Sequence, residues 1–113
     1  MNMNMSMEIR YIEPAALHDE MLRLRQEEQM DFLECLTGMD WGETLGVMYH
    51  LRSSKYGHDL ALRVETENRE NPELPSVSDI WATANLNERE VFDFYGIRFI
   101  NHPDMRRLFL RND

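Results

Sequence analysis

The run NEREVFDFYGIRFINHPDMRRL, residues 87–108, gathers side chains that could do chemistry at short spacing. Its carboxylates Glu88, Glu90 and Asp93 belong to the residue type that acts as general acid, general base or metal ligand. Glu90 and Asp93 are three apart, so on a helix they could share one cation. Magnesium and calcium sites usually recruit more than two such ligands, however. The composition therefore favours a solvated, charged helix face over a metal-dependent enzyme, which is kept as an alternative.

Other catalytic patterns are absent from the sequence. It contains no HExxH, no paired Glu-x-x-His, no GxSxG, no P-loop and no GxGxxG, and its four histidines are scattered. Cys35 is the single cysteine, which excludes an intrachain disulfide and a cysteine-ligated iron–sulfur cluster within this chain. Its place in the apolar run FLECL predicts a small, buried side chain. The residues therefore predict no catalytic, cofactor-binding or metal site.

A helix must position the three carboxylates. Asn85-Leu86-Asn87-Glu88 has the form of a capping box, which predicts a helix over residues 86–95 that ends at Gly96. At 100° per residue, Arg89, Glu90 and Asp93 share a solvent-facing side, where Arg89 and Asp93 are four apart and can pair. The opposite arc, predicted to face the core, holds Val91, Phe92, Phe94 and Tyr95.

The first forty residues predict one strand and two helices. Met7–Ile12 has the pattern of a short strand, and Pro14 fits the first turn of a helix. A second helix is predicted over Met30–Thr37, with Gly38 as its C-terminal stop. The apolar positions of the first helix, at helical spacing, are Leu17, Met21 and Leu24.

The middle of the chain predicts an antiparallel hairpin, because TLGVMYHLR and HDLALRVET both alternate apolar and polar residues around a short connector. His50 faces away from the apolar row and is predicted at the surface. Thr66–Ser78 is polar with two prolines and predicts a surface loop. Asp79–Ala82 predicts a helical turn and Ile97–Ile100 a strand, after which His102 can cap the next turn. The expected fold is α+β, a two-layer domain with a small, mainly antiparallel sheet packed against helices.

Composition bounds the class of protein. The 113 residues fit one domain, predicted over residues 7–113 after a disordered start at 1–6. No apolar run approaches the roughly 20 residues needed to span a bilayer, and no basic-then-apolar leader is present. The net charge is −9 with a single lysine, which argues against nucleic-acid binding. Residues 97–113 hold four arginines and two aspartates, so a basic end follows an acidic body, which suggests a protein partner.

The order of these residues resembles that of the 30 kDa-type (C-type) subunit of respiratory complex I, NADH:quinone oxidoreductase. The family pattern is ERE-aromatic-D-aromatic-G-[IV]-x-F followed by GHPDLRRIL, and the likeness covers about residues 30–110, including PSVSDIW and FLECLTGMDW. The positions that match the pattern are Glu88, Arg89, Glu90, Asp93, Gly96, Ile97, Phe99, His102, Pro103, Asp104, Arg106 and Arg107.

The resemblance implies a structural subunit with no redox cofactor and no active site of its own. It would dock onto the quinone-site D-type subunit, beside iron–sulfur subunits, at the cytoplasmic side of the inner membrane, in a complex that couples electron transfer to proton translocation. Quinone and iron–sulfur clusters would belong to those partners. His102, Asp104, Arg106 and Arg107 would position the C-terminal segment, and Arg89 would pair with Asp93 within the helix or across the interface.

Two departures from the family pattern and one rival family accompany this resemblance. Asn101 stands where the family usually has glycine, and the chain stops at Asp113, where family members commonly continue into a tail that wraps a neighbouring subunit. The rival is the equivalent scaffold domain of a membrane-bound nickel–iron hydrogenase, such as formate hydrogenlyase, because the motif alone does not separate the two assemblies.

Overall fold

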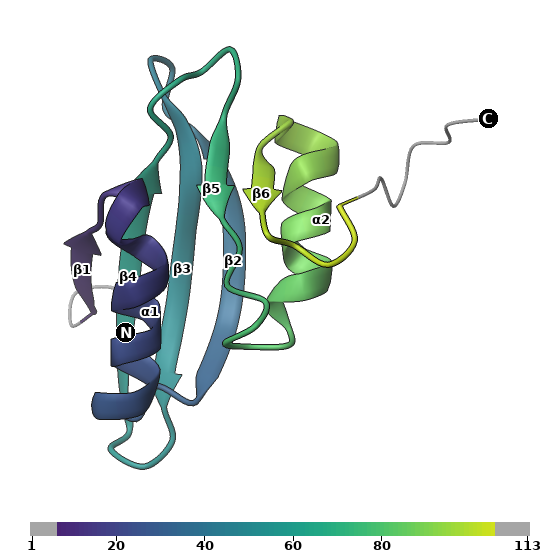
Figure 1. Ribbon diagram of the computed structural model, residues 1–113. Coiled ribbons are helices and arrows are strands. Elements are labelled where there is room, and N and C mark those ends of the chain that lie inside the picture. Colours follow the sequence, from purple (N-terminus) through teal and green to yellow (C-terminus); the bar gives the residue numbers. More distant parts are fainter. Residues whose placement is uncertain (1–6, 106–113) are drawn as a thin grey trace.

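Four strands form a mixed sheet in the order β1-β4-β3-β2 in the computed structural model, which describes residues 7–105 (Figure 1). β3 pairs antiparallel with both β2 and β4, whereas β1 pairs parallel with β4. The strands are β1 (Glu8–Tyr11), β2 (Phe32–Asp40), β3 (Leu45–Ser53) and β4 (His58–Glu65). The α+β class and the mainly antiparallel sheet are confirmed. The predicted disorder of residues 1–6 lies outside the described residues.

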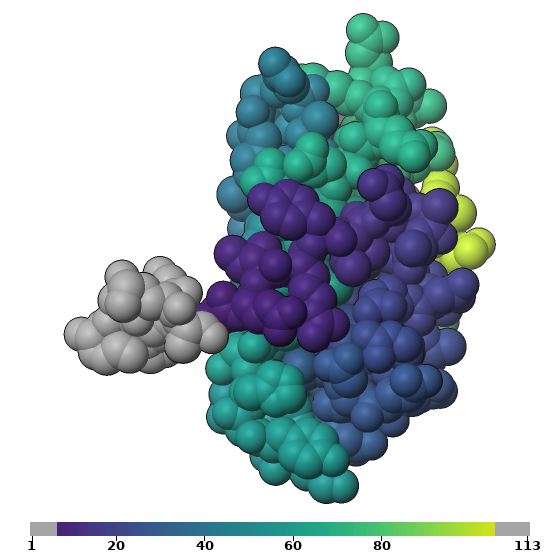
Figure 2. Space-filling view, turned by 90° about the vertical axis from the view of Figure 1, so that its left-hand side faces the viewer, coloured from purple at the N-terminus to yellow at the C-terminus, as the bar shows by residue number. Residues whose placement is uncertain are grey.

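The first helical segment covers the inner face of this sheet. A short 3-10 helix, η2 (Pro14–Ala16), leads into α1 (Leu17–Glu27), and Pro14 stands at its start as predicted. The three apolar positions of α1 have no exposed surface, because their spacing puts them on the side that faces the sheet. Figure 2 shows the neighbouring surfaces of β1 and α1 at the β1 edge of the molecule.

The predicted hairpin is confirmed, and its inner row forms the core. Leu51 is paired with Leu60, Tyr49 with Leu62 and Val47 with Val64. All of these side chains are buried, with an exposed fraction of 1% or less. On the outer face, His50 is half-buried and its Nε2 lies 3.0 Å from Oδ1 of Asp59, so the predicted orientation of His50 away from the apolar row is confirmed.

The helix predicted over residues 30–37 is wrong, because that segment forms the edge strand β2. Leu33 and Leu36 are three apart, which is helical spacing, yet the register of β2 against β3 shifts between Leu33 and Cys35. The extra residue of this bulge brings both leucines to the core face. It also turns Cys35 outward, so the predicted burial of Cys35 is wrong and the thiol is exposed.

The segment predicted as a surface loop over residues 66–78 also holds regular structure. β5 (Glu73–Pro75) pairs parallel with β6 (Arg98–Ile100) in a second, two-stranded sheet. Leu74 and Val77 are buried, although polar residues and prolines surround them. The structure of this region depends on the pairing of two strands that lie 25 residues apart in the sequence. A local sequence pattern cannot indicate such a distant pairing. Between β5 and β6 lie the predicted helical turn, where Trp81 N–H donates to the Val77 carbonyl, and α2 (Ala84–Tyr95).

Candidate functional site

α2 carries the charged run and packs beside β2, the edge strand of the large sheet (Figure 1). The helix ends at Gly96, which adopts φ 75°, and the Gly96 N–H donates to the Phe92 carbonyl, as the sequence predicts. Its beginning differs from the prediction. The N-cap residue is Thr83, and no hydrogen bond from a side-chain group caps this end of the helix. The expected capping box is therefore wrong, and Glu88 has another role.

Glu88 is fully buried on the inner side of α2, with no exposed surface. Ser76 Oγ donates to its Oε1 at 2.7 Å, and the Val77 backbone N–H donates to its Oε2 at 2.8 Å. Both donors lie in the segment after β5, so one carboxyl group ties α2 to the small sheet. Burial disfavours the charged form and raises the pKa of Glu88 to about 7, although the two hydrogen bonds oppose this shift.

His102 lies on the other side of the same carboxyl group. Its imidazole is fully buried, and Nε2 is 3.9 Å from Glu88 Oε1. The backbone N–H of Asp104 donates to Nδ1 at 2.9 Å, so Nδ1 is an acceptor and the ring proton sits on Nε2. Nε2 is 2.9 Å from the Asn85 carbonyl and donates to it. The neutral imidazole therefore joins the segment after β6 to the first turn of α2. His102 accepts from the Asp104 N–H, but residues 103–105 form no helical turn, so the predicted cap of a following turn stays a prediction.

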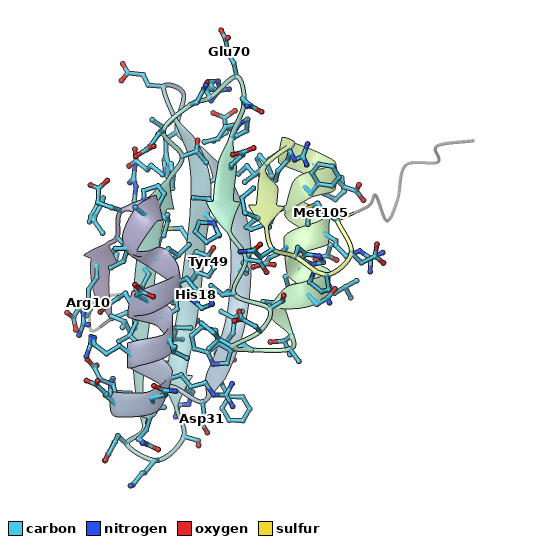
Figure 3. The ribbon with its side chains drawn as sticks, in the orientation of Figure 1. Arg10, His18, Asp31, Tyr49, Glu70 and Met105 are labelled. Atoms are coloured by element: carbon cyan, nitrogen blue, oxygen red, sulfur yellow. The ribbon has the colours of Figure 1, made fainter. Side chains whose placement is uncertain are left out.

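Tyr49 supplies a third buried polar group near this pair, from the middle of β3 (Figure 3). Its hydroxyl is buried and has no hydrogen-bond partner among residues 7–105. Burial, and then the negative charge of Glu88, raise the pKa of Tyr49 well above its ordinary value. Glu88, His102 and Tyr49 form a buried polar cluster between α2, β3 and the small sheet. No spacing rule could have found it, because the three residues come from three separate elements.

The opposite side of α2 carries the other charged residues of the motif. Glu88 and Glu90 point about 200° apart on the helix, so the three carboxylates do not converge. Arg89, Glu90 and Asp93 are half-buried, and no ion pair between Arg89 and Asp93 occurs among the ion pairs of the described part of the protein. The Arg89 Nε is buried without a hydrogen bond to any residue in 7–105. Their pairing across an interface stays a prediction.

The aromatic arc predicted to face the core is only partly correct. Val91 is 5% exposed, but Phe94 is 72% and Tyr95 38% exposed. The Tyr95 ring lies against Gly38 of β2, where a Cβ would clash with the ring. Gly38 thus lets the ring approach the strand and does not stop a helix, so its predicted role is wrong. These residues line a groove of about 290 Å³ between β2 and α2, formed by Leu36, Thr37, Gly38, Glu90, Val91, Phe94 and Tyr95.

The remaining motif residues follow β6. Asn101, where the family pattern has glycine, adopts φ 71°, a left-handed conformation that asparagine tolerates. Pro103 is exposed and Asp104 is half-buried. Arg106 and Arg107 lie outside the described residues, so their predicted role at an interface stays a prediction.

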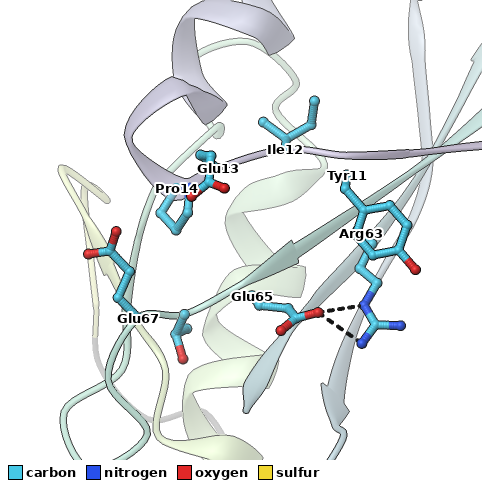
Figure 4. A pocket seen from close by; sticks show the side chains of 8 residues that line it. Tyr11, Ile12, Glu13, Pro14, Arg63, Glu65 and Glu67 are labelled. Carbon is cyan, nitrogen blue, oxygen red and sulfur yellow. Dashed lines mark hydrogen bonds and ion pairs between the residues drawn. The ribbon is translucent and has the colours of Figure 1, made fainter.

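A second hollow lies where β1 ends beside β4, with a volume of about 320 Å³ (Figure 4). Its walls carry Glu13, Glu65 and Glu67, and Arg63 donates to Glu65 at 2.9 Å. The Arg63 guanidinium also lies over the rings of Trp41 and Tyr11, at 3.8 and 5.3 Å from their centroids. Within residues 7–105, no three His, Cys, Asp or Glu side chains are grouped so that they could hold a metal ion.

Comparison with known proteins identifies relatives across nearly the whole sequence. The model of the family described as the respiratory-chain NADH dehydrogenase, 30 Kd subunit, matches residues 10–113. The NADH-quinone oxidoreductase C/D subunit of Bacteroides fragilis is 66% identical over 117 residues, which cover 94% of this chain and 22% of that protein. The NADH-quinone oxidoreductase C subunit of Chloroherpeton thalassium is 42% identical and is matched over 80% of this chain and 39% of its own length. The chain thus spans about a fifth of the Bacteroides relative.

The fold also occurs in a solved structure. One chain of the membrane-bound sulfane sulfur reductase, an archaeal respiratory membrane complex, superposes with a TM-score of 0.77 at 24% identity. The match covers 94% of this chain and 65% of that chain, and it shows that the two share a fold. No helix between residues 7 and 105 is long and apolar enough to cross a membrane.

Proposed function

This chain belongs to the family of the 30 kDa subunit of respiratory-chain NADH dehydrogenase, and from that premise we propose that it is the structural C-type subunit, or domain, of a complex I-type NADH:quinone oxidoreductase. The single observation that carries this proposal is the family match over residues 10–113. The protein would support electron transfer from NADH to quinone, coupled to proton translocation, by holding its neighbours in place. Quinone and iron–sulfur clusters would be bound by those neighbours.

The proposed principal partner is a D-type, quinone-site subunit. The name of the Bacteroides fragilis relative, a C/D subunit, joins the two in one protein, which supports this partner. The links of α2 to the segments after β5 and after β6 suit a docking platform, because Glu88 holds the first of these segments to the helix and His102 holds the second. We propose a peripheral place on the cytoplasmic side of the membrane, next to iron–sulfur subunits.

The nickel–iron hydrogenase alternative is not favoured. The relatives from Bacteroides and Chloroherpeton are both named as subunits of NADH-quinone oxidoreductase. A metal-dependent enzyme built on Glu88, Glu90 and Asp93 has no geometric support, because Glu88 faces the core and Glu90 the opposite side of α2.

The test is affinity purification of the full-length protein from native membranes, with mass spectrometry of the proteins that accompany it. A D-type subunit together with iron–sulfur subunits is the expected result. Recovery of a nickel–iron large subunit instead would show that the protein is a scaffold subunit of a hydrogenase. Purification of the protein without any partner would remove the support for a scaffold role.

A further inference from the structure

The groove between β2 and α2 is lined by the exposed side chain of Phe94, and Leu86, also exposed, lies on the same side of α2 two turns earlier. Leu86 and Phe94 are 53% and 72% exposed, although both lie on a regular helix that could present polar residues there. Leu86, Glu90 and Phe94 follow one another at intervals of four, so they form a single stripe along α2. Large apolar side chains that gather in this way on a surface mark interaction sites.

The negative charge of Glu90 within the stripe favours a binding partner that carries a basic group. Glu90 lies between the two apolar residues and lines the groove. Among the described residues, the Asn87 side-chain amide donates to it at 3.2 Å, and no Arg, Lys or His of residues 7–105 forms an ion pair with it. The protein as a whole is acidic, with a net charge of −9. A basic group on the occupant would therefore be attracted to the groove and could bind this carboxylate.

Gly38 of β2, at the base of the groove, allows the Tyr95 ring to approach the strand. Gly38 has no side-chain atoms, so the Tyr95 ring lies against β2 and lines the groove together with Leu36 and Thr37. β2 is also an edge strand of its sheet, so no further strand within residues 7–105 covers its far side. The groove is thus a formed feature of about 290 Å³ whose walls belong to packed elements.

We propose that this groove receives a segment of the D-type partner in which an arginine or lysine is flanked by large apolar side chains. The apolar residues would contact Phe94 and Leu86, and the basic group would pair with Glu90. This inference rests on the proposed function, and adds the surface and the chemistry of the contact. The aromatic wall would supply most of the binding, as buried aromatic anchors do in other interfaces.

The experiment places a photo-cross-linking residue, p-benzoylphenylalanine, at position 94 of the full-length protein within the complex purified from native membranes. The expected product joins position 94 to a D-type peptide that contains arginine or lysine beside apolar residues. The same residue at position 56, exposed on the hairpin between β3 and β4, is the control and should not give that product. A cross-link to residues 106–113 of the same protein, to a second copy or to a different subunit would overturn the proposal.

Two substitutions test the energetics in the same complex. Glu90→Arg and Phe94→Ala should each lower the amount of D-type subunit retained after dilution, by on the order of tenfold in affinity. Glu70→Arg, at the tip of a distant loop, and Tyr56→Ala are the matched controls (Figure 3). If the unmodified protein retains the D-type subunit but neither variant loses it, the groove proposal fails and the proposed function stands. If the unmodified protein retains no D-type subunit, both fail.

Discussion

Glu88 and His102 face each other inside the protein, with Oε1 of Glu88 3.9 Å from Nε2 of His102 and no solvent exposure of either side chain. Their hydrogen bonds reach different segments: Glu88 accepts from the Ser76 hydroxyl and the Val77 N–H after β5, whereas His102 bonds to the start of α2 and to Asp104. Two residues of the sequence motif thus stabilise the fold from within, while on α2 itself Glu90 is half-buried and Phe94 is exposed.

The stability of the protein should depend on pH through Glu88. The pKa of Glu88 is about 7 in the folded protein, above the ordinary value near 4.5, so folding favours its protonated form. This contribution is fully present below pH 4.5 or so and is lost as pH rises through about 7. The free energy of unfolding should therefore fall by roughly 3 kcal/mol between pH 5 and 9 from this group alone.

Glu88→Gln should remove that slope, because the amide does not titrate and can still accept from Val77 N–H. Urea denaturation at a series of pH values measures it, with Glu90→Gln on the opposite side of α2 as the control. Equal slopes in the unmodified protein and Glu88→Gln would contradict the raised pKa.

His102→Ala should destabilise the protein by about 2–3 kcal/mol, since it leaves the Asn85 carbonyl and the Asp104 N–H without their buried partner and opens a cavity. His58→Ala is the control, because His58 is exposed at the start of β4. Denaturation in urea at pH 7 compares the two. Similar losses in both variants would mean that the His102 hydrogen bonds stabilise little.

Gly38→Ala should displace the Tyr95 ring and destabilise the protein by about 1–3 kcal/mol, because the added methyl group meets the ring and β2 is held in its sheet. Combining it with Tyr95→Ala should recover much of this loss, which a double-mutant cycle measures as a coupling energy of about 1 kcal/mol. Thr37→Ala, exposed on the same strand, controls for the change of residue within β2. Additive effects would show that the two positions do not touch.

Asp40 and Arg69 form a bidentate pair at 2.9 and 3.0 Å, and this pair, together with the Gly42 N–H, lowers the pKa of Asp40 to about 2. Arg69→Ala should raise that pKa towards its ordinary value near 4, as read from an NMR titration of the carboxyl carbon. In the unmodified protein the Asp40–Arg69 pair stabilises the fold fully above about pH 4, and this stabilisation is lost as the pH falls through about 2. Arg52→Ala, whose partner is Asp59, should leave the Asp40 titration unchanged.

Arg106→Glu combined with Arg107→Glu should weaken capture of the D-type subunit, because arginine forms bidentate links to carboxylates that glutamate would repel. The melting temperature of the purified protein should stay the same, which separates docking from folding. Arg98→Glu, exposed on β6, is the matched change of charge. Undiminished co-purification of the D-type subunit with the double variant would count against a docking role for the two arginines.

Local patterns in the sequence determined much of this protein. Alternation along 45–65 predicted the hairpin and its buried row, helical spacing predicted the inner face of α1, and Gly96 predicted the end of α2. Each of these features depends on residues that are close together in the sequence, within one helix or one hairpin. The run from Glu88 to Arg107 was also sufficient to indicate the family.

Tertiary structure alone decided the rest. Because of one bulge in β2, Leu33 and Leu36 face the core at a spacing that is typical of a helix. Only the pairing of this segment with β3 shows that it is a strand. Glu88 looked like a helix cap, because its true partners, Ser76 and His102, are 12 and 14 positions away and join it only when β5, α2 and β6 pack together. Phe94 and Tyr95 looked like core residues, because helical periodicity shows which side chains share a face and does not show whether another element covers that face.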